Sequence, residues 1–421
     1  MTRGAPTTRG SDTLVPLETL MMTTRLHSLF VASIALFVSA LAIAAPEGGT
    51  LKIVSSLPRT GSANAHTTTI VNGIRLAIDE FGGKVGDWTI EYQDMDDASP
   101  QRGNWDPAVE AQNANSAARD DEVVAYIGTF NSGAAKVAIP ILNRAGLAMV
   151  SPANTYPGLT KPGQGEANEP MVYRPSGKIN YFRVVPTDDL QGVQAANWAK
   201  DLGVTRVFVL HDRELYGKGI ADVFKRQAEK QGIEVVGFEG IDSKAPNYRA
   251  LVTKVKSTRP DLVYFGGTTQ SNAGQVAKDL RSGGFEGKYM VPDGCFEQAF
   301  IEAAGAENLN DRTFVTFGGL PPEKLTGRGA EFCSAYRTKF SADPEAYAAY
   351  GYECARVVLQ AIARAAQKDR AGILEAIATT KDFDGVLGRW SFDANGDTSS
   401  QLMSGQTVHD GKFEFVKVLG N

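Results

Sequence analysis

The chain has 421 residues, with 43 Lys and Arg against 48 Asp and Glu, which gives a formal net charge of -5. That balance argues against nucleic acid as the main partner, because binding phosphates requires a basic face. Charged residues make up 22% and apolar residues 43%, as in ordinary globular proteins, and the length suggests two or three domains. Three Cys and four His are too few for a disulfide scaffold or a Cys/His metal cage, so we predict no metal and no cofactor.

The N-terminal region has the pattern of a secretory signal. An uncharged run over residues 29–44, LFVASIALFVSALAIA, follows Arg25 and ends in the small residues Ala42 and Ala44. The alternative is a membrane anchor, but the run is shorter than the ~20 residues that a membrane-spanning helix needs. We therefore expect a signal peptide over residues 1–44, cleaved after Ala44, and an exported product.

Beyond the signal, short apolar runs typical of strands alternate with helical patterns. The expected strands are 51–57, 89–95, 123–127, 147–151, 181–185, 206–211, 233–238, 261–266, 288–291 and 313–317. The expected helices between them are 68–81, 106–119, 132–145, 191–202, 217–231, 247–257 and 272–282. Such alternation predicts an α/β fold with parallel sheets of βαβ units. These units are too many for one small sheet, so we expect two lobes.

The end of the chain departs from this alternation. Helices are expected over 327–340, 346–366 and 371–379, followed by strands over 387–392, 401–408 and 412–418. The Gly- and Pro-rich segment 161–178 is expected to be a surface insertion. Cys333 and Cys354 fall on consecutive predicted helices, so a disulfide between them and three buried free thiols both remain open.

Catalytic motifs are missing from the sequence. It contains no P-loop, no complete G-x-G-x-x-G, no G-x-S-x-G elbow and no H-E-x-x-H. The segment 393–397, DANGD, resembles half a calcium loop, but Thr398 stands where that loop needs Gly, which favours a plain turn. His211 and Asp212 have no nucleophile set up beside them, and a histidine that caps local backbone is the preferred interpretation. We predict that the protein is not an enzyme.

Binding residues are expected where strands end, since ligands of open α/β sheets lie beyond the carboxyl ends of the strands. Ser132 follows one strand as a predicted N-cap, and the helix after it offers free amides to a carboxylate. Thr155 lies in the loop after the next strand and could complete that anion pocket. Asp293 and Tyr216 follow strands of the second half, and Asp293 could hold an ammonium group. The simpler alternatives are a helix cap at Ser132 and a turn at Asp293.

Many segments resemble those of periplasmic branched-chain amino acid (Leu/Ile/Val)-binding proteins of ABC transporters. They include YIGTFNSGAAKVAIPILNRAGLAMVSPANTYPGLT, YFRVVPTDDLQG, HDRELYGKG, VYFGGTTQ, PEAYAAYGYECARVVLQAI and FDANGD, and the resemblance covers about residues 46–419. It implies the type I periplasmic binding fold, in which two Rossmann-like lobes with parallel-sheet cores are joined by three crossings. The expected lobes are 46–184 with 319–391, and 185–318 with 392–421.

The resemblance also implies ligand-binding residues. An acidic residue of the second lobe, Asp293, is expected to hold the ligand's α-ammonium. Tyr216 is the expected aromatic lid, and His66 and Tyr347 are two further pocket positions. The α-carboxylate is expected to bind to two first-lobe loops, through Phe130, Asn131, Ser132, Ala153, Asn154 and Thr155. This chain has Asp293 where many relatives carry Glu, and Thr268 with Thr269 where an aromatic residue is common. Those differences imply a more polar pocket.

By this resemblance, the protein is expected to be the periplasmic solute-binding component of an ABC importer. It would work as a monomer, capture a small amino acid between its lobes and deliver it to an inner-membrane permease. A branched-chain amino acid is the leading ligand, and polar amino acids, amides or urea are alternatives. Two rival functions are a ligand-sensing module of the same fold and an exported α/β enzyme such as an amidase.

Overall fold

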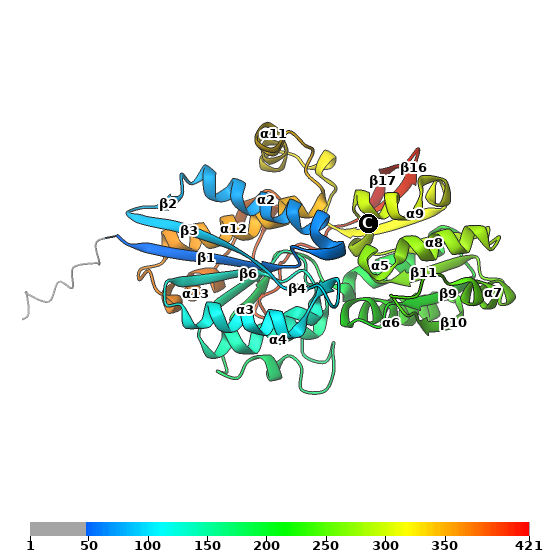
Figure 1. The fold of residues 1–421 in the computed structure, drawn as a ribbon, viewed down its shortest axis with the longest axis horizontal. Coiled ribbons are helices and arrows are strands. Elements are labelled where there is room, and N and C mark those ends of the chain that lie inside the picture. Colours follow the sequence, from blue (N-terminus) through cyan, green and yellow to red (C-terminus); the bar gives the residue numbers. More distant parts are fainter. Residues whose placement is uncertain (1–47, 421) are drawn as a thin grey trace, which may run out of the picture. The chain divides into compact units, whose positions relative to one another are not determined.

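The computed structural model describes residues 48–420. The predicted signal peptide and its cleavage site lie outside the described residues. Within 48–420, no helix has both the length and the apolar character required to cross a membrane. The described chain builds two main sheets, each flanked by helices, as the sequence predicts (Figure 1).

The first sheet has six strands in the order β2-β3-β1-β6-β7-β8. All neighbours in it are parallel except β2, which runs antiparallel to β3. Its central strands β1 and β6 are largely buried, and β6 is a continuous apolar run, as expected for a strand that is covered on both faces. In chain order, the strands are β1 (Thr50–Leu57), β2 (Lys84–Val85), β3 (Trp88–Asp96), β6 (Val123–Gly128), β7 (Ala148–Ser151) and β8 (Tyr181–Arg183).

The second sheet has seven strands in the order β10-β9-β11-β12-β13-β16-β17. The first five are parallel, and the last two add an antiparallel edge from the end of the chain. Their bounds are β9 (Arg206–His211), β10 (Glu234–Gly240), β11 (Leu262–Gly266), β12 (Lys288–Val291), β13 (Thr313–Gly318), β16 (Met403–His409) and β17 (Lys412–Leu419). Two small hairpins stand apart, β4 (Ala98–Ser99) with β5 (Asn104–Trp105), and β14 (Phe383–Gly385) with β15 (Gly388–Trp390).

Helices cover both faces of each sheet. Around the first sheet, α2 and α12 pack together on one side while α3 and α4 pair on the other (Figure 1), and α5 and α6 pack together against the second sheet. The bounds are α2 (Asn64–Glu80), α3 (Pro107–Arg119), α4 (Ser132–Arg144), α5 (Asp188–Asp201), α6 (Leu215–Lys230) and α7 (Arg249–Ser257). They continue with α8 (Ala273–Ser282), α9 (Gln298–Ala304), α10 (Ala306–Leu309), α11 (Arg328–Phe340), α12 (Ala346–Arg364) and α13 (Arg370–Ala378).

Two glycines let α2 and α12 approach each other closely. A Cβ atom at Gly73 would collide with the carbonyl oxygen of Ala348, and one at Gly351 would collide with that of Ile70. Because no side chain fits between the two backbones, the helices are held in a fixed register. Each helix contributes an aromatic side chain beside the pocket, so this register determines where the two rings lie relative to each other.

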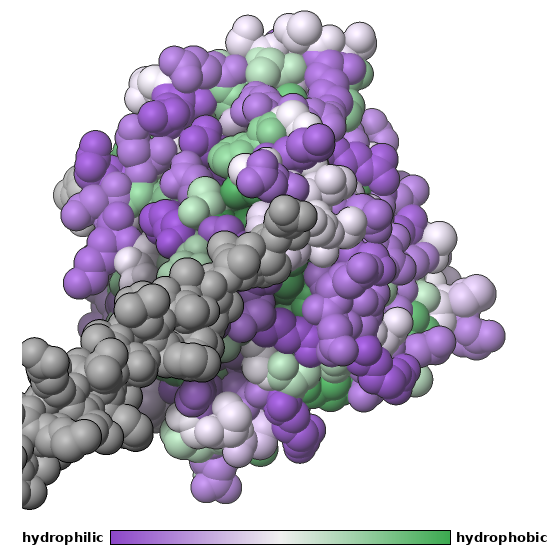
Figure 2. Space-filling model, turned by 90° about the vertical axis from the view of Figure 1, so that its left-hand side faces the viewer, coloured by the Kyte–Doolittle hydropathy of each residue, from purple (hydrophilic) through white to green (hydrophobic). Residues whose placement is uncertain are grey.

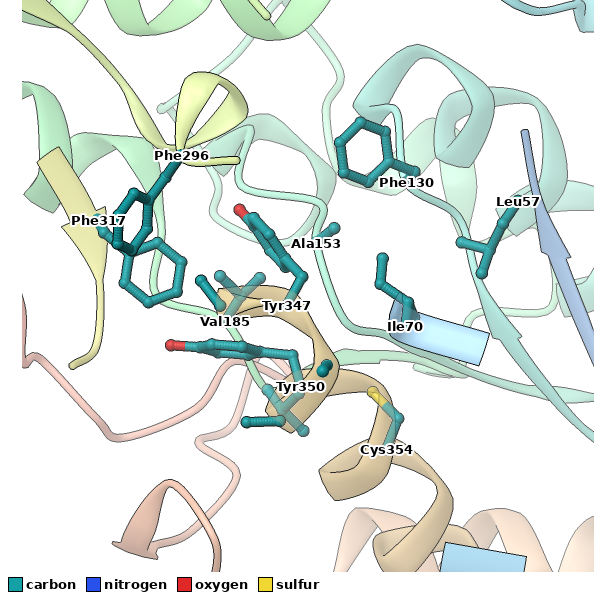
Figure 3. Close-up of a cluster of buried hydrophobic side chains, with 14 of the residues drawn as sticks. Leu57, Ile70, Phe130, Ala153, Val185, Phe296, Phe317, Tyr347, Tyr350 and Cys354 are labelled. Carbon is teal, nitrogen blue, oxygen red and sulfur yellow. The ribbon is translucent and has the colours of Figure 1, made fainter. Parts of the chain in front are cut away.

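Buried apolar side chains run continuously from one sheet to the other. Figure 3 shows Tyr347 and Tyr350 projecting from α12, with Phe296 and Phe317 from the second-sheet side and Phe130 from the first. The end of the molecule seen in Figure 2 is mostly hydrophilic where it is visible, with small separate apolar spots. Large apolar side chains are gathered in the cores of the lobes and where the lobes meet.

Several local predictions need correction. The helix expected from residue 68 begins at Asn64, because a 3-10 turn over Gly61–Ala63 leads into it without a side-chain cap. The short elements β4, β5, α9, α10 and β14 were not predicted, since elements of a few residues carry little periodicity. Cys295, Cys333 and Cys354 are all buried free thiols, so the possible disulfide does not form.

One buried ion pair fastens the chain where it passes between the sheets. Arg183, at the end of β8, bonds through Nε to Asp397 Oδ1 at 2.6 Å, and both side chains are almost fully buried. The guanidinium also donates to the carbonyl oxygens of Asn154 and Tyr156, at 3.0 and 2.8 Å. It thereby ties the return crossing near 392–397 to the loop after β7.

Candidate functional site

A small pocket lies between the two sheets. Its lining comes from the loop before α4, the loop after β7, the start of α6, the ends of β11 and β12, and the start of α12. The lining residues are Phe130, Asn131, Ser132, Ala153, Tyr216, Thr268, Asp293, Gly294 and Tyr347.

The first-sheet wall presents the start of α4. Asn131, rather than Ser132, occupies the N-cap position, so Ser132 is the first residue of the helix and not its cap. The Ser132 hydroxyl oxygen accepts the Tyr156 amide hydrogen at 3.4 Å, which leaves the hydroxyl proton available to a ligand. The first-turn amides of a helix have no intrahelical partner and carry its positive dipole end. This wall is thus suited to an anion such as a carboxylate.

The loop after β7 supports that wall from behind. The Ser151 hydroxyl accepts the Ala153 and Asn154 amides at 3.2 and 2.9 Å. Asn154 itself donates through Nδ2 to the Phe130 carbonyl oxygen at 3.0 Å and holds the two loops together. Thr155 is also buried, and its hydroxyl has no hydrogen-bond partner. Asn154 and Thr155 therefore lie behind the pocket rather than on its surface.

The second-sheet wall presents the carboxylate of Asp293. Tyr216 donates its hydroxyl to Asp293 Oδ1 at 2.6 Å, and Tyr347 donates to Oδ2. Burial raises the pKa of Asp293, although the two tyrosine hydroxyls act in the opposite direction. A cationic group placed in the pocket would compensate this desolvated carboxylate.

A second buried carboxyl group lies close to Asp293. Asp188, at the start of α5, is fully buried, and neither of its oxygens has a hydrogen-bond partner. Burial, followed by the charge of Asp293, raises the pKa of Asp188 well above its ordinary value. Burial thus makes ionisation of Asp188 and Asp293 together unfavourable, and a positive charge held nearby would offset that cost.

His66 joins the two halves beside the pocket. Its Nδ1 lies 3.3 Å from Glu297 Oε2, and both side chains are buried, one on α2 and the other just before α9. The ring also contacts Phe130 and Tyr347, at centroid separations of 4.9 and 5.0 Å. Burial alone would lower the pKa of His66, but the charges of Glu297, Glu345 and Asp293 outweigh it and raise the pKa.

Replacing Glu297 with Gln should reverse the sign of the His66 pKa shift. The carboxylate that favours the imidazolium is gone, whereas the burial that disfavours it remains. NMR titration of the imidazole should place the pKa above 6.5 in the parent protein and below it in Glu297→Gln. Glu345→Gln, a more distant charge, should move it less. An unchanged titration in Glu297→Gln would contradict the ion pair.

The structure therefore brings most of the predicted site residues together. Phe130, Asn131, Ser132, Ala153, Tyr216, Thr268, Asp293 and Tyr347 line the pocket, while His66, Asn154 and Thr155 lie behind its walls. The sequence analysis missed Asp188, Arg183 and Glu297. A charged residue within the apolar run 181–185 was the available signal for Arg183.

The remaining polar motifs have local structural roles. The His211 ring accepts the Arg213 amide through Nδ1 at 3.1 Å, as a residue that caps local backbone would do. In the segment 393–397, the Asp393 carboxylate accepts the amides of Asn395 and Asp397 at 2.8 and 2.9 Å, which is a turn. Among residues 48–420, no group of three or more His, Cys, Asp and Glu side chains is arranged to hold a metal ion.

Comparisons with known proteins show the family of this chain. A family model described as periplasmic binding protein matches residues 50–412. Leu/Ile/Val-binding protein homolog 2 of Brucella abortus (strain 2308) is 28% identical over 366 residues, which cover 85% of this chain and 91% of that protein. The amino acid binding protein of Pseudomonas aeruginosa is 26% identical over 343 residues, covering 81% and 85%.

Solved structures show the same fold. The leucine-binding protein LivK of Thermotoga maritima superposes with a TM-score of 0.77 at 27% identity, covering 88% of this chain and 98% of that one. LivJ of Streptococcus pneumoniae, solved in complex with isoleucine, superposes with a TM-score of 0.76 at 27% identity. The match covers 88% of this chain and 99% of that one. Since the family model spans most of the sequence and the two-sheet fold is shared with these structures, the chain belongs to the periplasmic binding protein family.

Proposed function

We propose that this protein is the solute-binding component of an ABC importer and that it captures a small amino acid between its two lobes. The observation that carries the proposal is the pairing of opposite walls in one small pocket, with the start of α4 facing the region of Asp293. A zwitterion matches both walls. Each charge-assisted hydrogen bond would contribute roughly 1.5–3 kcal/mol.

Within this class, the relatives make the branched-chain amino acids the first ligands to test. Relatives that carry Leu/Ile/Val-binding names and a neighbour solved with isoleucine support this choice. The rings of Phe130, Tyr216 and Tyr347 offer apolar surface to an aliphatic side chain. The protein accordingly transports rather than transforms its ligand.

The proposed cycle consists of lobe closure and release. Residues 46–184 with 319–391 form one lobe, and residues 185–318 with 392–421 form the other. A ligand that contacts both walls binds best when the lobes are together, and it therefore shifts the population toward the closed form. The mature protein, without residues 1–44, acts as a monomer in the periplasm and passes the ligand to an inner-membrane permease.

Thermal unfolding with added amino acids tests the proposal. A ligand present at 100 times its Kd stabilises the folded state by about 2.7 kcal/mol, so leucine, isoleucine or valine should raise the Tm clearly. The protein should first be unfolded and refolded to remove any ligand carried through purification. If none of the standard amino acids raises the Tm of protein treated in this way, the proposed function is wrong.

A further inference from the structure

A chain of hydrogen bonds leads away from the second-sheet wall of the pocket. Thr268 lines the pocket, and its Oγ1 lies 2.9 Å from Ser271 Oγ. Ser271 donates in turn to Asp212 Oδ2 at 2.7 Å. The other Asp212 oxygen accepts the Glu214 amide at 2.9 Å. The chain thus ends on a carboxylate that already accepts two hydrogens.

The ionised carboxylate fixes the direction of this chain. An ionised carboxylate only accepts, so the single proton of Ser271 goes to Asp212. Ser271 can then interact with Thr268 only as an acceptor, and the proton of Thr268 is used on Ser271. Only the lone pairs of the Thr268 hydroxyl oxygen remain to interact with a ligand in the pocket. Its hydroxyl is therefore an acceptor toward a ligand.

Asn131, on the opposite wall, carries a second acceptor. Its Oδ1 is buried and has no hydrogen-bond partner, although the residue lines the same pocket. A buried acceptor without a donor costs free energy, whereas a ligand that supplies the donor removes that cost. Thr268 and Asn131 thus present two acceptors, and an aliphatic side chain supplies a donor to neither.

We propose that the pocket selects an α-amino acid whose side chain carries a hydrogen-bond donor, a hydroxyl or an amide, with Thr268 and Asn131 as the acceptors that recognise it. This inference rests on the proposed function, since it takes the ligand to be an amino acid. It narrows the ligand to the polar members of that class. A purely apolar pocket discriminates weakly against an added hydroxyl, but a pocket that presents acceptors rejects the analogue that lacks the donor.

Calorimetric titration with two pairs of similar shape tests the inference. Threonine matches valine in shape, and asparagine approximates leucine. We expect threonine to bind at least about tenfold more tightly than valine, and asparagine than leucine, because the aliphatic partner leaves an acceptor unpaired. The titrations should be run at pH 8, since burial raises the pKa of Asp212 to about 7 and the carboxylate must be ionised.

The variant Thr268→Val separates the hydroxyl from the shape of the side chain. It should reduce the preference for threonine over valine to about threefold or less, whereas Thr269→Val, next to it but outside the pocket lining, should leave the preference intact. Valine binding as tightly as threonine to the parent protein overturns this inference and leaves the proposed function standing. Failure of every amino acid to bind overturns the proposed function and this inference together.

Discussion

Replacing Asp293 with Asn should weaken amino acid binding by roughly thirtyfold to several thousandfold. The substitution keeps the shape and leaves Oδ1 to accept from one of the two tyrosines, but it removes the negative charge that faces the ligand ammonium. Loss of one partner of a buried charge pair costs about 2–5 kcal/mol. At about 1.4 kcal/mol per factor of ten, this gives the expected range. Calorimetric titration of the two proteins measures it.

The same variant should not lose stability in the absence of ligand. Because burial raises the pKa of Asp293, ionising it in the folded state is unfavourable relative to the unfolded chain. Stability linked to this carboxyl falls as pH rises through its raised pKa, and Asn removes that penalty. Asp201→Asn, an exposed position on α5, is the matched control. An affinity within threefold of the parent would show that Asp293 is only a turn residue.

The second large effect is expected at Arg183. Replacing it with Met should lower the free energy of unfolding by about 3–5 kcal/mol, because Asp397 becomes an unpaired buried charge. The carbonyl oxygens of Asn154 and Tyr156 lose their donors as well. Urea unfolding followed by circular dichroism measures the difference.

An exposed ion pair of the same kind provides the control. Arg328 bonds to Asp384 at 2.8 Å, with about half of each side chain exposed. Such surface pairs contribute ~0–1 kcal/mol, so Arg328→Met should be nearly neutral. Adding Asp397→Asn to Arg183→Met should recover part of the lost stability, since the unpaired charge is gone. If Arg183→Met and Arg328→Met lowered the free energy of unfolding equally, the buried ion pair of Arg183 would contribute no more than the exposed one.

The architecture was readable from the sequence because strand and helix periodicities alternate over long, regular segments. The run 207–210, VFVL, predicts a strand covered on both faces, and β9 is buried between helices. Boundaries were less accurate. Nothing in the sequence marks Asn64 as the start of α2, since its N-cap is Ala63 and no side chain caps the helix.

The site was predictable only in part. Ser132 and Asp293 could be proposed from their positions after strands, and the family resemblance added the aromatic positions. Two contacts could not be predicted, the pairing of His66 with Glu297 and that of Tyr347 with Asp293. Each of them joins residues that lie far apart in the sequence. Such contacts depend on how the lobes meet. The burial of Asp188 is likewise a property of tertiary packing.

The order of the chain through the second sheet has a consequence for biosynthesis. Strand β13 pairs with β16, and the two are separated by the helices that return to the first sheet. A ribosome therefore releases most of the protein while β13 still has an unpaired edge. Open strand edges are templates for association with other chains. A product that stops before Met403 should hence aggregate, and the protein reaches its protected form only when its last strands emerge.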